Sequence, residues 1–382
     1  MLKRLLALCL AGMLILFSAA VFAEDTAQTQ PIDLGNEEVV EDDVADDGMG
    51  EIVGQSDRVS PSVKGLKPLY TTKIKFLTAN GSYATIRADQ DQNSKALGTA
   101  YKGNVITIYK VFPAYVLAEY NGVSGFILRT CIDENVTVLD PENTPPYGVT
   151  VNQYVATTTA VAKVYVDPDT TSKPFPIEIG AGSKVAILGF NGSFAKVLYW
   201  RSYGYIDASL LKDLVVVSPT ITPMSDDTPL AAFSSFFVYN NGVELNDGRV
   251  KNIMRSCESM TRIMQPGESL NFNEQVGPYS KSNGYFPAPV LVNGTAKPGY
   301  GGGTCQSSST LYNTVRQLPG VAIVYRRPHG PACARYLPMH QDAAVGNSTL
   351  NFIFRNDYDF PIRILAQTTG EGVLTIQIFR AE

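Results

Sequence analysis

The feature that most constrains the fold is a pattern of short strands that occurs twice in the chain. The first copy runs from Gly103 to Ile127 and the second from Gly182 to Ile206. Each copy has a glycine, two apolar strands joined through a polar stretch, a tight turn, and an ending of glycine, an aromatic residue and isoleucine. Because no long helical period interrupts this pattern between about Tyr70 and Asp213, it predicts two small antiparallel β-barrels.

These two blocks resemble bacterial SH3-like modules, and the Gly-aromatic-Ile ending carries most of the resemblance. We expect two small all-β SH3-like barrels, at residues 66–140 and 150–216. In exported bacterial proteins the resemblance implies binding to peptidoglycan. Tyr115, Trp200 or Tyr203 could stack on a sugar or a peptide, and the alternative for each ring is a place in a barrel core.

Charge separates the N-terminal part of the chain from the rest. The formal net charge is −5, but residues 24–57 contain twelve acidic residues and no Lys or Arg. Residues 58–382 carry 29 of the 31 bases and 24 of the 36 acids, a net charge of +5. We therefore predict an acidic, disordered linker over residues 24–65. The positive remainder suits anionic wall polymers as partners, and no nucleic-acid partner is predicted.

The first 23 residues are predicted to be a secretory signal peptide. Lys3 and Arg4 precede an apolar run that ends near Ala20, and small residues up to Ala23 offer a cleavage site. A retained membrane anchor is the alternative, because an uncleaved run of this length can nearly span a bilayer. After cleavage we expect a secreted or wall-associated protein with no transmembrane span.

Residues 230–382 follow a proline-rich linker at 217–229 and contain both histidines of the chain. Apolar residues at helical spacing predict an amphipathic helix from Val250 to Met264, with Cys257 on its apolar face, and a second helix from Cys305 to Pro319. Strands are expected at 321–326, 350–355, 360–366 and 373–380. This part of the chain is therefore predicted to be an α+β domain.

Cys305 stands where a nucleophile could be activated. Three glycines and Thr304 precede it, so it should lie at or just before the start of a helix. Backbone N–H groups and the helix dipole stabilise a thiolate there, and the same N–H groups can hold an oxyanion. His329, in the loop after the strand at 321–326, is the predicted acid/base. Asp342 is the preferred residue to orient the imidazole, with Glu274 and Asn271 as alternatives.

Other roles for these residues stay open. The mature chain would keep Cys131, Cys257, Cys305 and Cys333, so disulfides are possible, including one between Cys305 and Cys333. Cys257 could be a buried hydrophobic residue or a disulfide partner. Cys305, His329, Cys333 and His340 could instead bind zinc. The preferred interpretation needs neither a metal nor a cofactor.

Longer motifs in this part of the chain resemble the VanW domain over about residues 233–368. The matching segments are Pro266 to Pro278, Gly284-Tyr285, Ala288-Pro289-Val290, Gly301 to Tyr312, and Asp342-Ala343. The resemblance implies an L,D-transpeptidase of bacterial cell walls with Cys305 as nucleophile and His329 as acid/base. Candidate substrate or oxyanion residues are Gly302, Gly303, Thr304, Gln306, Asn271 and Asn273. The sequence departs from the family pattern at Met339-His340-Gln341, where a Gly-rich turn is expected.

The function predicted from these observations is peptidoglycan cross-linking. Cys305 would attack the third residue of a tetrapeptide stem, release D-alanine, and pass the acyl group to an amine of a neighbouring stem, giving a 3-3 cross-link. The expected partners are peptidoglycan stem peptides and glycan. The alternatives are a non-catalytic peptidoglycan-binding protein, and a thiol peptidase or carboxypeptidase that acts on stem peptides.

Overall fold

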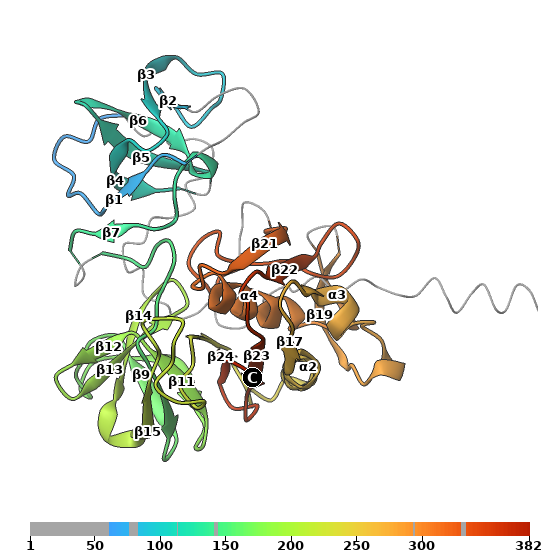
Figure 1. Cartoon of the computed structure of the whole chain (residues 1–382). Helices are drawn as coiled ribbons and strands as arrows, with labels where there is room; N and C mark the ends of the chain where they lie inside the picture. The colour runs from blue at the N-terminus through green and yellow to red at the C-terminus, as the bar shows by residue number, and fades with distance from the viewer. Residues whose placement is uncertain (1–60, 76–82, 113, 141–143, 293–294, 330–333) are drawn as a thin grey trace, which may run out of the picture.

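The computed structural model describes residues 61–75, 83–112, 114–140, 144–292, 295–329 and 334–382 (Figure 1). The predicted signal peptide, most of the predicted acidic linker and Cys333 lie outside the described residues. Strands are much more numerous than helices in this structure. In the part of the chain that is described, no helix combines the length and the apolar character needed to cross a bilayer.

The first β-module, residues 70–138, is a single antiparallel sheet with the strand order β3-β2-β6-β5-β4-β1-β7. Its core contains alternate residues of adjacent strands, such as Ile106 and Ile108 of β4 and Val116 and Ala118 of β5, with Ile108 opposite Ala118. The strands are β1 (Tyr70–Lys73), β2 (Tyr83–Arg87), β3 (Ala96–Tyr101), β4 (Val105–Val111), β5 (Tyr115–Tyr120), β6 (Val123–Leu128) and β7 (Thr137–Val138).

The second β-module, residues 154–216, has a five-stranded sheet, β10-β9-β14-β13-β12, and a three-stranded sheet, β11-β8-β15. Its core also takes in Phe236 and Val373 from the C-terminal part of the chain. The strands are β8 (Tyr154–Thr158), β9 (Ala162–Tyr165), β10 (Pro174–Ile179), β11 (Lys184–Ile187), β12 (Gly189–Asn191), β13 (Phe194–Tyr199), β14 (Ser202–Asp207) and β15 (Leu211–Val216).

The structure explains the repeated glycine of the two blocks. A Cβ atom on Gly125 would lie 2.5 Å from the backbone oxygen of Arg87, and one on Gly204 would lie 2.4 Å from a methyl group of Val164. Glycine therefore lets β6 and β14 approach their neighbours closely, and each strand is followed by one 3-10 turn. The predicted β-class is confirmed, whereas the sheets are open and closed barrels are not found among the described residues.

The C-terminal module, residues 231–380, contains a four-stranded sheet, β16-β24-β23-β17, and a three-stranded sheet, β18-β22-β21. Helix α4 packs against β16 and β24 of the first of these sheets (Figure 1). Its Tyr312 meets Phe352 of the second sheet edge to face. Helix α2 packs against β23, β19 and α4. The elements are β16 (Ala231–Phe236), α2 (Glu244–Met260), β17 (Arg262–Met264), β18 (Ser269–Asn271), α3 (Phe272–Val276), β19 (Pro287–Val292), β20 (Thr295–Tyr300), α4 (Thr304–Val315), β21 (Val321–Arg326), β22 (Phe352–Asn356), β23 (Ile362–Gln367) and β24 (Val373–Arg380).

Every residue of α4 is buried, although most of its side chains are polar. Small hydroxyl side chains allow the helix to fit between elements, and their hydroxyls bond to carbonyls one turn earlier. Thr310 Oγ1 donates to Gln306 O at 2.7 Å, and Thr314 Oγ1 donates to Thr310 O at 2.8 Å. These bonds satisfy polar groups that would otherwise destabilise a buried helix.

Several predicted element boundaries need correction. The first helix ends at Met260, because residues 262–264 form β17 and pair with β23, Arg262 opposite Ile364. Met264 is buried there as a strand residue rather than as part of a helical stripe. The strands predicted to start at 350 and 360 start at Phe352 and Ile362, while β21 and β24 have the predicted bounds.

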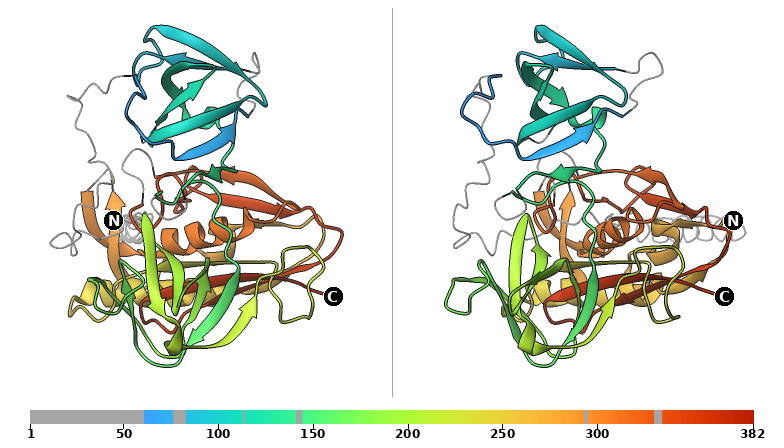
Figure 2. Two further views of the ribbon diagram at one scale, coloured as in Figure 1. Left: turned by 90° about the vertical axis from the view of Figure 1, so that its left-hand side faces the viewer. Right: turned by 60° about the vertical axis from the view of Figure 1, so that its left-hand side comes forward.

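Both β-modules contact the C-terminal module (Figure 2). In the second β-module, Ala186 N donates to Ser234 Oγ at 2.8 Å and Trp200 Nε1 donates to Phe236 O at 3.3 Å. Tyr115 is buried in the first β-module, and Tyr203 packs with Trp200 against residues 334–337. The three aromatic rings considered as ligand platforms therefore take part in packing.

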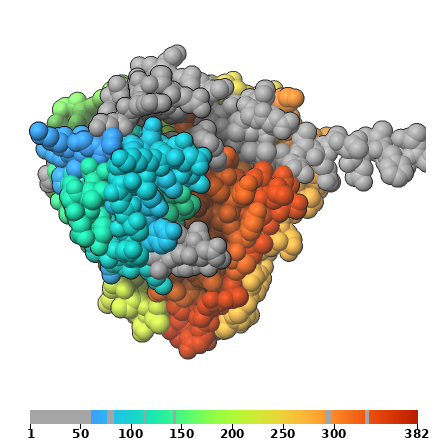
Figure 3. Space-filling view, turned by 90° about the horizontal axis from the view of Figure 1, so that it is seen from above, coloured from blue at the N-terminus to red at the C-terminus, as the bar shows by residue number. Residues whose placement is uncertain are grey.

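The first β-module lies beside the C-terminal module in the view from above (Figure 3). Arg129 Nη2 donates to Met339 O at 3.0 Å, and Glu134 forms an ion pair with the buried guanidinium of Arg316 in the segment just after α4. Burial alone would raise the pKa of Glu134, but the charges of Arg316, Arg326, Lys75 and Arg129 together outweigh it and lower this pKa.

Candidate active site

Cys305 is the second residue of α4, as the sequence predicted. The chain enters the helix through Gly301 and Gly303, whose φ angles are +87° and +100°. Gly303 is required there, since L residues rarely adopt this conformation and a Cβ atom would lie 3.0 Å from Arg249 O. This entry places the Cys305 thiol in the interior, where the residue is fully buried.

The thiol of Cys305 contacts the backbone of Val345. Val345 N–H donates to Sγ at 3.3 Å, and Sγ donates to Val345 O at 3.4 Å. The segment that carries Val345 is fixed against α4, because Ala343 N–H donates to Ser309 Oγ at 2.8 Å and Ser308 Oγ donates to Ala343 O. These bonds hold the chain from Asp342 onward beside the first turns of the helix.

His329 and Asp342 form a direct pair. His329 Nδ1 lies 2.5 Å from Asp342 Oδ2, and the backbone N–H of His329 donates to the same oxygen at 2.7 Å. The two side chains are 9% and 1% exposed. Burial alone would raise the pKa of Asp342, but the hydrogen bond and charge of His329 lower it to about 2. Asp342 is therefore ionised at neutral pH and fixes the orientation of the imidazole.

The second imidazole nitrogen, Nε2, is left for the thiol. Burial lowers the pKa of His329, but the Cys305 side chain and Asp342 outweigh it and hold this pKa well above its usual value. Nε2 is buried and makes no hydrogen bond of standard geometry with the described residues. The structure thus brings Cys305, His329 and Asp342 together in one site, with the thiol in electrostatic range of the imidazole.

Arg326 is a member of the site that the sequence analysis did not identify. Its Nε donates to Asp342 O at 2.7 Å, and its Nη2 donates to His340 O and lies 3.9 Å from Asp342 Oδ1. The guanidinium lies over the ring of Tyr312, 4.5 Å from its centroid. Its position at the end of β21, three residues before His329, is the sequence feature that could have identified it.

His340 explains the departure from the expected Gly-rich turn. Its φ angle is +62°, a left-handed conformation that favours glycine. The turn before Asp342 is therefore present, with a histidine in the strained position. Burial, followed by the charge of Arg129, lowers the pKa of His340 to about 4.

The glycine turn does not present all of its predicted oxyanion donors. Thr304 N–H donates to Gly301 O and Gln306 N–H donates to Gly303 O, both at 3.1 Å. Gly302 packs closely, since a Cβ atom there would lie 2.3 Å from Pro289 O. The backbone donors of residues 304 and 306 are thus already used within the turn.

The side chain of Gln306 has a structural role, which corrects its predicted role in substrate binding. Its Nε2 donates to Ser235 Oγ and to Phe236 O, both at 3.0 Å, and its Oε1 accepts from Arg249 Nη2 at 2.6 Å. The residue is fully buried. Gln306 therefore ties α4 to β16 and α2.

Asn271 and Asn273 also hold backbone. Asn271 Oδ1 accepts from Asn351 Nδ2 at 2.8 Å and caps α3. Asn273 Nδ2 donates to the carbonyls of residues 347 and 350, both at 2.8 Å, and its Oδ1 accepts from Gly346 N–H at 3.1 Å. The two asparagines fix the turn that follows Val345. Glu274 is exposed, and the orienting position beside His329 belongs to Asp342.

The structure bears on the alternatives for the cysteines. Cys131, Cys257 and Cys305 are all buried. The alternative of a Cys305–Cys333 disulfide stays a prediction, because it falls on Cys333, outside the described residues. Burial raises the pKa of Cys257, which packs in the core on the apolar face of α2. Within the described ranges no group of three or more His, Cys, Asp or Glu residues has an arrangement that could hold a metal, and Cys333 lies outside those ranges.

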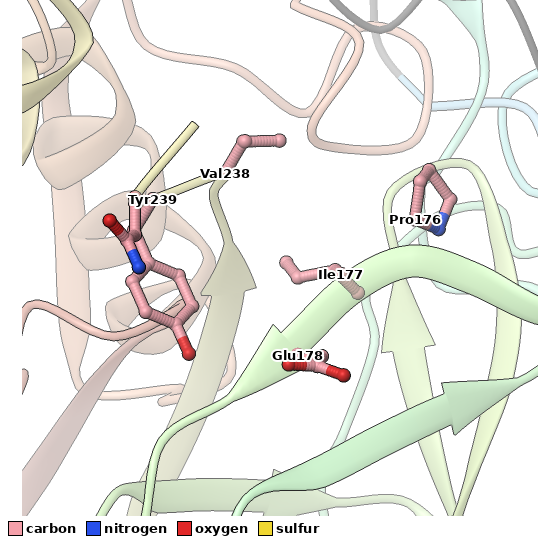
Figure 4. Close-up of a pocket in the computed structure, with 6 residues that line it drawn as sticks. Pro176, Ile177, Glu178, Val238 and Tyr239 are labelled. Carbon is pink, nitrogen blue, oxygen red and sulfur yellow. The ribbon is translucent and has the colours of Figure 1, made fainter. Parts of the chain in front are cut away.

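A hollow of about 230 Å³ lies elsewhere, between β10 and the segment after β16. Pro176, Ile177 and Glu178 line one side, and Val238 and Tyr239 line the other (Figure 4). Asn240 also lines the hollow. None of the residues around Cys305 takes part in it. The hollow is therefore a separate feature from the buried site around Cys305.

Comparisons with known proteins agree with the resemblance of the C-terminal module. Residues 248–379 match the family model described as VanW like protein. The chain is 33% identical over 188 residues to the uncharacterized protein YoaR of Bacillus subtilis (strain 168). The aligned part covers 48% of this chain and about 60% of the length of YoaR.

Two solved structures share little with this chain in detail. NlpC2 from Trichomonas vaginalis is 10% identical with a TM-score of 0.17, covering 83% of this chain and 99% of that chain. NlpC1 from the same organism is 11% identical with a TM-score of 0.18, covering 85% and 97%. TM-scores this low do not establish a shared fold.

Proposed function

From a VanW-like domain at residues 248–379 that holds Cys305, His329 and Asp342 in one site, we propose that the protein is a cysteine acyltransferase. The proposed reaction is that of an L,D-transpeptidase acting on peptidoglycan stem peptides. The observation that supports it most is the 2.5 Å contact between His329 Nδ1 and Asp342 Oδ2. Because Asp342 occupies Nδ1, Nε2 is the imidazole nitrogen that can exchange a proton at Cys305.

The proposed chemistry uses one proton carrier for two acyl transfers. The Cys305 thiolate attacks the carbonyl carbon of the third stem residue, and the carbonyl electron pair moves onto oxygen. As that pair returns, the bond to D-alanine breaks, and His329 Nε2 gives its proton to the leaving amine. The product is a thioester on Cys305 that retains the energy of the peptide bond.

The second transfer reverses these roles. An amine of a neighbouring stem attacks the thioester, neutral His329 accepts the proton of that amine, and the thiolate leaves. A new amide bond forms and no ATP is consumed. Asp342 stays ionised throughout and holds the imidazolium, because its pKa is about 2.

The burial of Cys305 favours transfer over hydrolysis. The residue is 0% exposed, so the structure describes a closed site that must open to admit a stem peptide. A site that closes again over the thioester excludes water, which competes with the amine. This supports a transferase over a carboxypeptidase.

We propose that the first β-module provides a binding surface for the wall. Tyr83 and Tyr101 are 49% and 58% exposed, lie opposite each other on β2 and β3, and have ring centroids 6.3 Å apart. Exposed rings of this kind stack on sugars or peptides. Tyr101→Ala should weaken retention on isolated peptidoglycan and leave stem-peptide conversion unchanged, whereas Phe190→Ala, an exposed ring of β12, should change neither.

The test of the catalytic proposal is direct. The full chain is incubated with disaccharide-tetrapeptide, and products are followed by mass spectrometry. Release of D-alanine with formation of cross-linked dimer is expected from the wild type and from Cys257→Ala, and not from Cys305→Ala. If the wild type forms no dimer, or if Cys305→Ala forms as much as the wild type, the transferase proposal is wrong.

A further inference from the structure

Tyr279 is a partly buried side chain linked through hydrogen bonds to the segment that contacts Cys305. It lies between α3 and the 3-10 turn η4 (Lys281–Asn283), with its ring edge to face against Tyr285 at 5.4 Å between centroids. Its hydroxyl donates to Asn273 Oδ1 at 2.8 Å. The same oxygen accepts the N–H of Gly346, the residue after the one that contacts the Cys305 thiol. Tyr279 is thus tied to the wall of the site opposite α4.

Tyr279 lies in the electrostatic field of Cys305. Burial raises the pKa of Tyr279 well above its usual value, and the charges of Tyr285 and Cys305 raise it further, while Thr304 acts in the opposite sense. The phenol therefore keeps its proton at any working pH. It can donate a hydrogen bond near the thiol without becoming charged itself.

Asn273 Oδ1, which accepts the hydrogen bond of the Tyr279 hydroxyl, also has a second donor. Asn273 Oδ1 also accepts from Gly346 N–H at 3.1 Å, so it stays hydrogen-bonded when Tyr279 turns away. Leaving a buried acceptor without a partner destabilises the folded state. The shared acceptor avoids this destabilisation and lets the hydroxyl change partner.

Two backbone donors of the glycine turn are not available to an oxyanion. The N–H groups of Thr304 and Gln306 already donate to Gly301 O and Gly303 O. An attack by Cys305 on a carbonyl nevertheless creates a negative oxygen that requires donors. The hydroxyl of Tyr279 is a proton-bearing group held within the influence of Cys305.

We propose that the Tyr279 hydroxyl donates a hydrogen bond to the oxyanion formed when Cys305 attacks an acyl carbonyl. This inference rests on the nucleophile of the proposed function. As the S–C bond forms, the carbonyl pair moves to oxygen and the hydroxyl turns from Asn273 Oδ1 to that oxygen. The proton stays on Tyr279, and the hydrogen bond ends when the pair returns and the leaving group departs.

The test compares two reactions of the same thiol in the full chain. S-acetyl-N-acetylcysteamine transfers its acetyl group through an oxyanion, whereas iodoacetamide alkylates the thiol by displacement at a saturated carbon and forms none. Both reagents need the same opening of the site, so the ratio of the two rates is independent of opening. Rates at Cys305 are measured by intact mass, with Cys305→Ala as the blank.

Tyr279→Phe should lower the acylation rate roughly 100-fold and leave the alkylation rate unchanged. Tyr285→Phe is the matched control, because it removes a buried hydroxyl of the same aromatic pair that bonds to Val276 O at 2.7 Å. The control should change neither rate. Equal loss of both rates in Tyr279→Phe, or loss of neither, overturns the assignment.

The outcome also separates this inference from the proposed function. In one outcome the wild type is acylated faster than Cys305→Ala, with a rate that depends on Tyr279, and yet forms no cross-linked stem peptides. That result supports Tyr279 as the hydrogen-bond donor and refutes the transpeptidase proposal. A wild type that is acylated no faster than Cys305→Ala refutes both, because no oxyanion forms for Tyr279 to receive.

Discussion

Replacing Asp342 by Asn tests whether the carboxylate stabilises the folded chain through its charge. The amide keeps the shape of the side chain but not its ionisation. The pKa of Asp342 is about 2 in the folded protein, against a usual value of 3.8. Since one pKa unit corresponds to about 1.4 kcal/mol, the ionised group contributes about 2 kcal/mol to the free energy of unfolding at neutral pH.

The pH dependence follows from the sign of this shift. The folded pKa is lower than the unfolded one, so the contribution is fully present above the unfolded pKa and is lost as the pH falls through about 2. Wild type and Asp342→Asn should therefore differ by about 2 kcal/mol at pH 7 and converge near pH 2. Removing the orienting carboxylate should also slow acyl transfer by on the order of 10³- to 10⁴-fold.

The assay can use two reporters that the chain offers. Trp200 is the only tryptophan, and it packs against residues 334–337 close to the Asp342 segment, so its fluorescence in urea reports unfolding. The chain has two histidines, so NMR can follow each one. The pKa of His329 should fall in the variant, and that of His340 should also fall from its value of about 4, because the charge of Asp342 raises both.

The control is Asp357→Asn, which removes an exposed carboxylate paired with Arg355 and should leave stability unchanged. A stability difference between wild type and Asp342→Asn that stays constant from pH 7 to pH 2 would refute the argument. It would show that packing rather than ionisation is lost.

Three further substitutions test residues that hold the elements around Cys305 in place, and urea unfolding measures the change in stability for each. Gly303→Ala should lower the free energy of unfolding by about 1–2 kcal/mol, because the φ angle is +100°, and should slow alkylation of the Cys305 thiol. Gln306→Leu should cost about 1–3 kcal/mol, because Arg249 loses a buried acceptor; an unchanged midpoint would mean that the amide is dispensable. Glu134→Gln should lower the free energy of unfolding by about 1–2 kcal/mol, because Arg316 keeps a buried charge without its partner. It should also speed proteolysis between the first β-module and the rest of the chain, and equal proteolysis of the variant and the wild type would contradict this.

The sequence could predict the features of the fold and the site that depend on residues close together in the chain. Three glycines before Cys305 and a helical period after it define the helix start, and the structure agrees. His329 was found because the chain has only two histidines, and it meets Asp342, the preferred candidate for orienting the imidazole. The glycine of the repeated β-blocks was visible as a pattern, and its cause is a close approach to the neighbouring strand.

The features that sequence could not predict depend on pairing between distant segments. Gln306 lies in the motif with Cys305, yet its amide bonds to residues 57 and 71 positions away, which makes it structural. Arg326 and Tyr279 acquire their places only through long-range packing. The end of α2 at Met260 is also set by tertiary pairing, since β17 takes the apolar residues that would have extended the helical stripe.

The position of β24 has a consequence for how fast the site can assemble. This strand lies between β16 and β23, and the Ser234–Thr375 hydrogen bond of the β16–β24 pair joins residues 141 positions apart. Helix α4 packs on the same two strands, so the Cys305 helix has no complete platform until this distant pair has formed. Closing so long a loop before its contacts are gained slows folding. Cys305 should thus remain an accessible thiol through most of the folding reaction and become protected in its last steps, which pulsed alkylation during refolding would reveal.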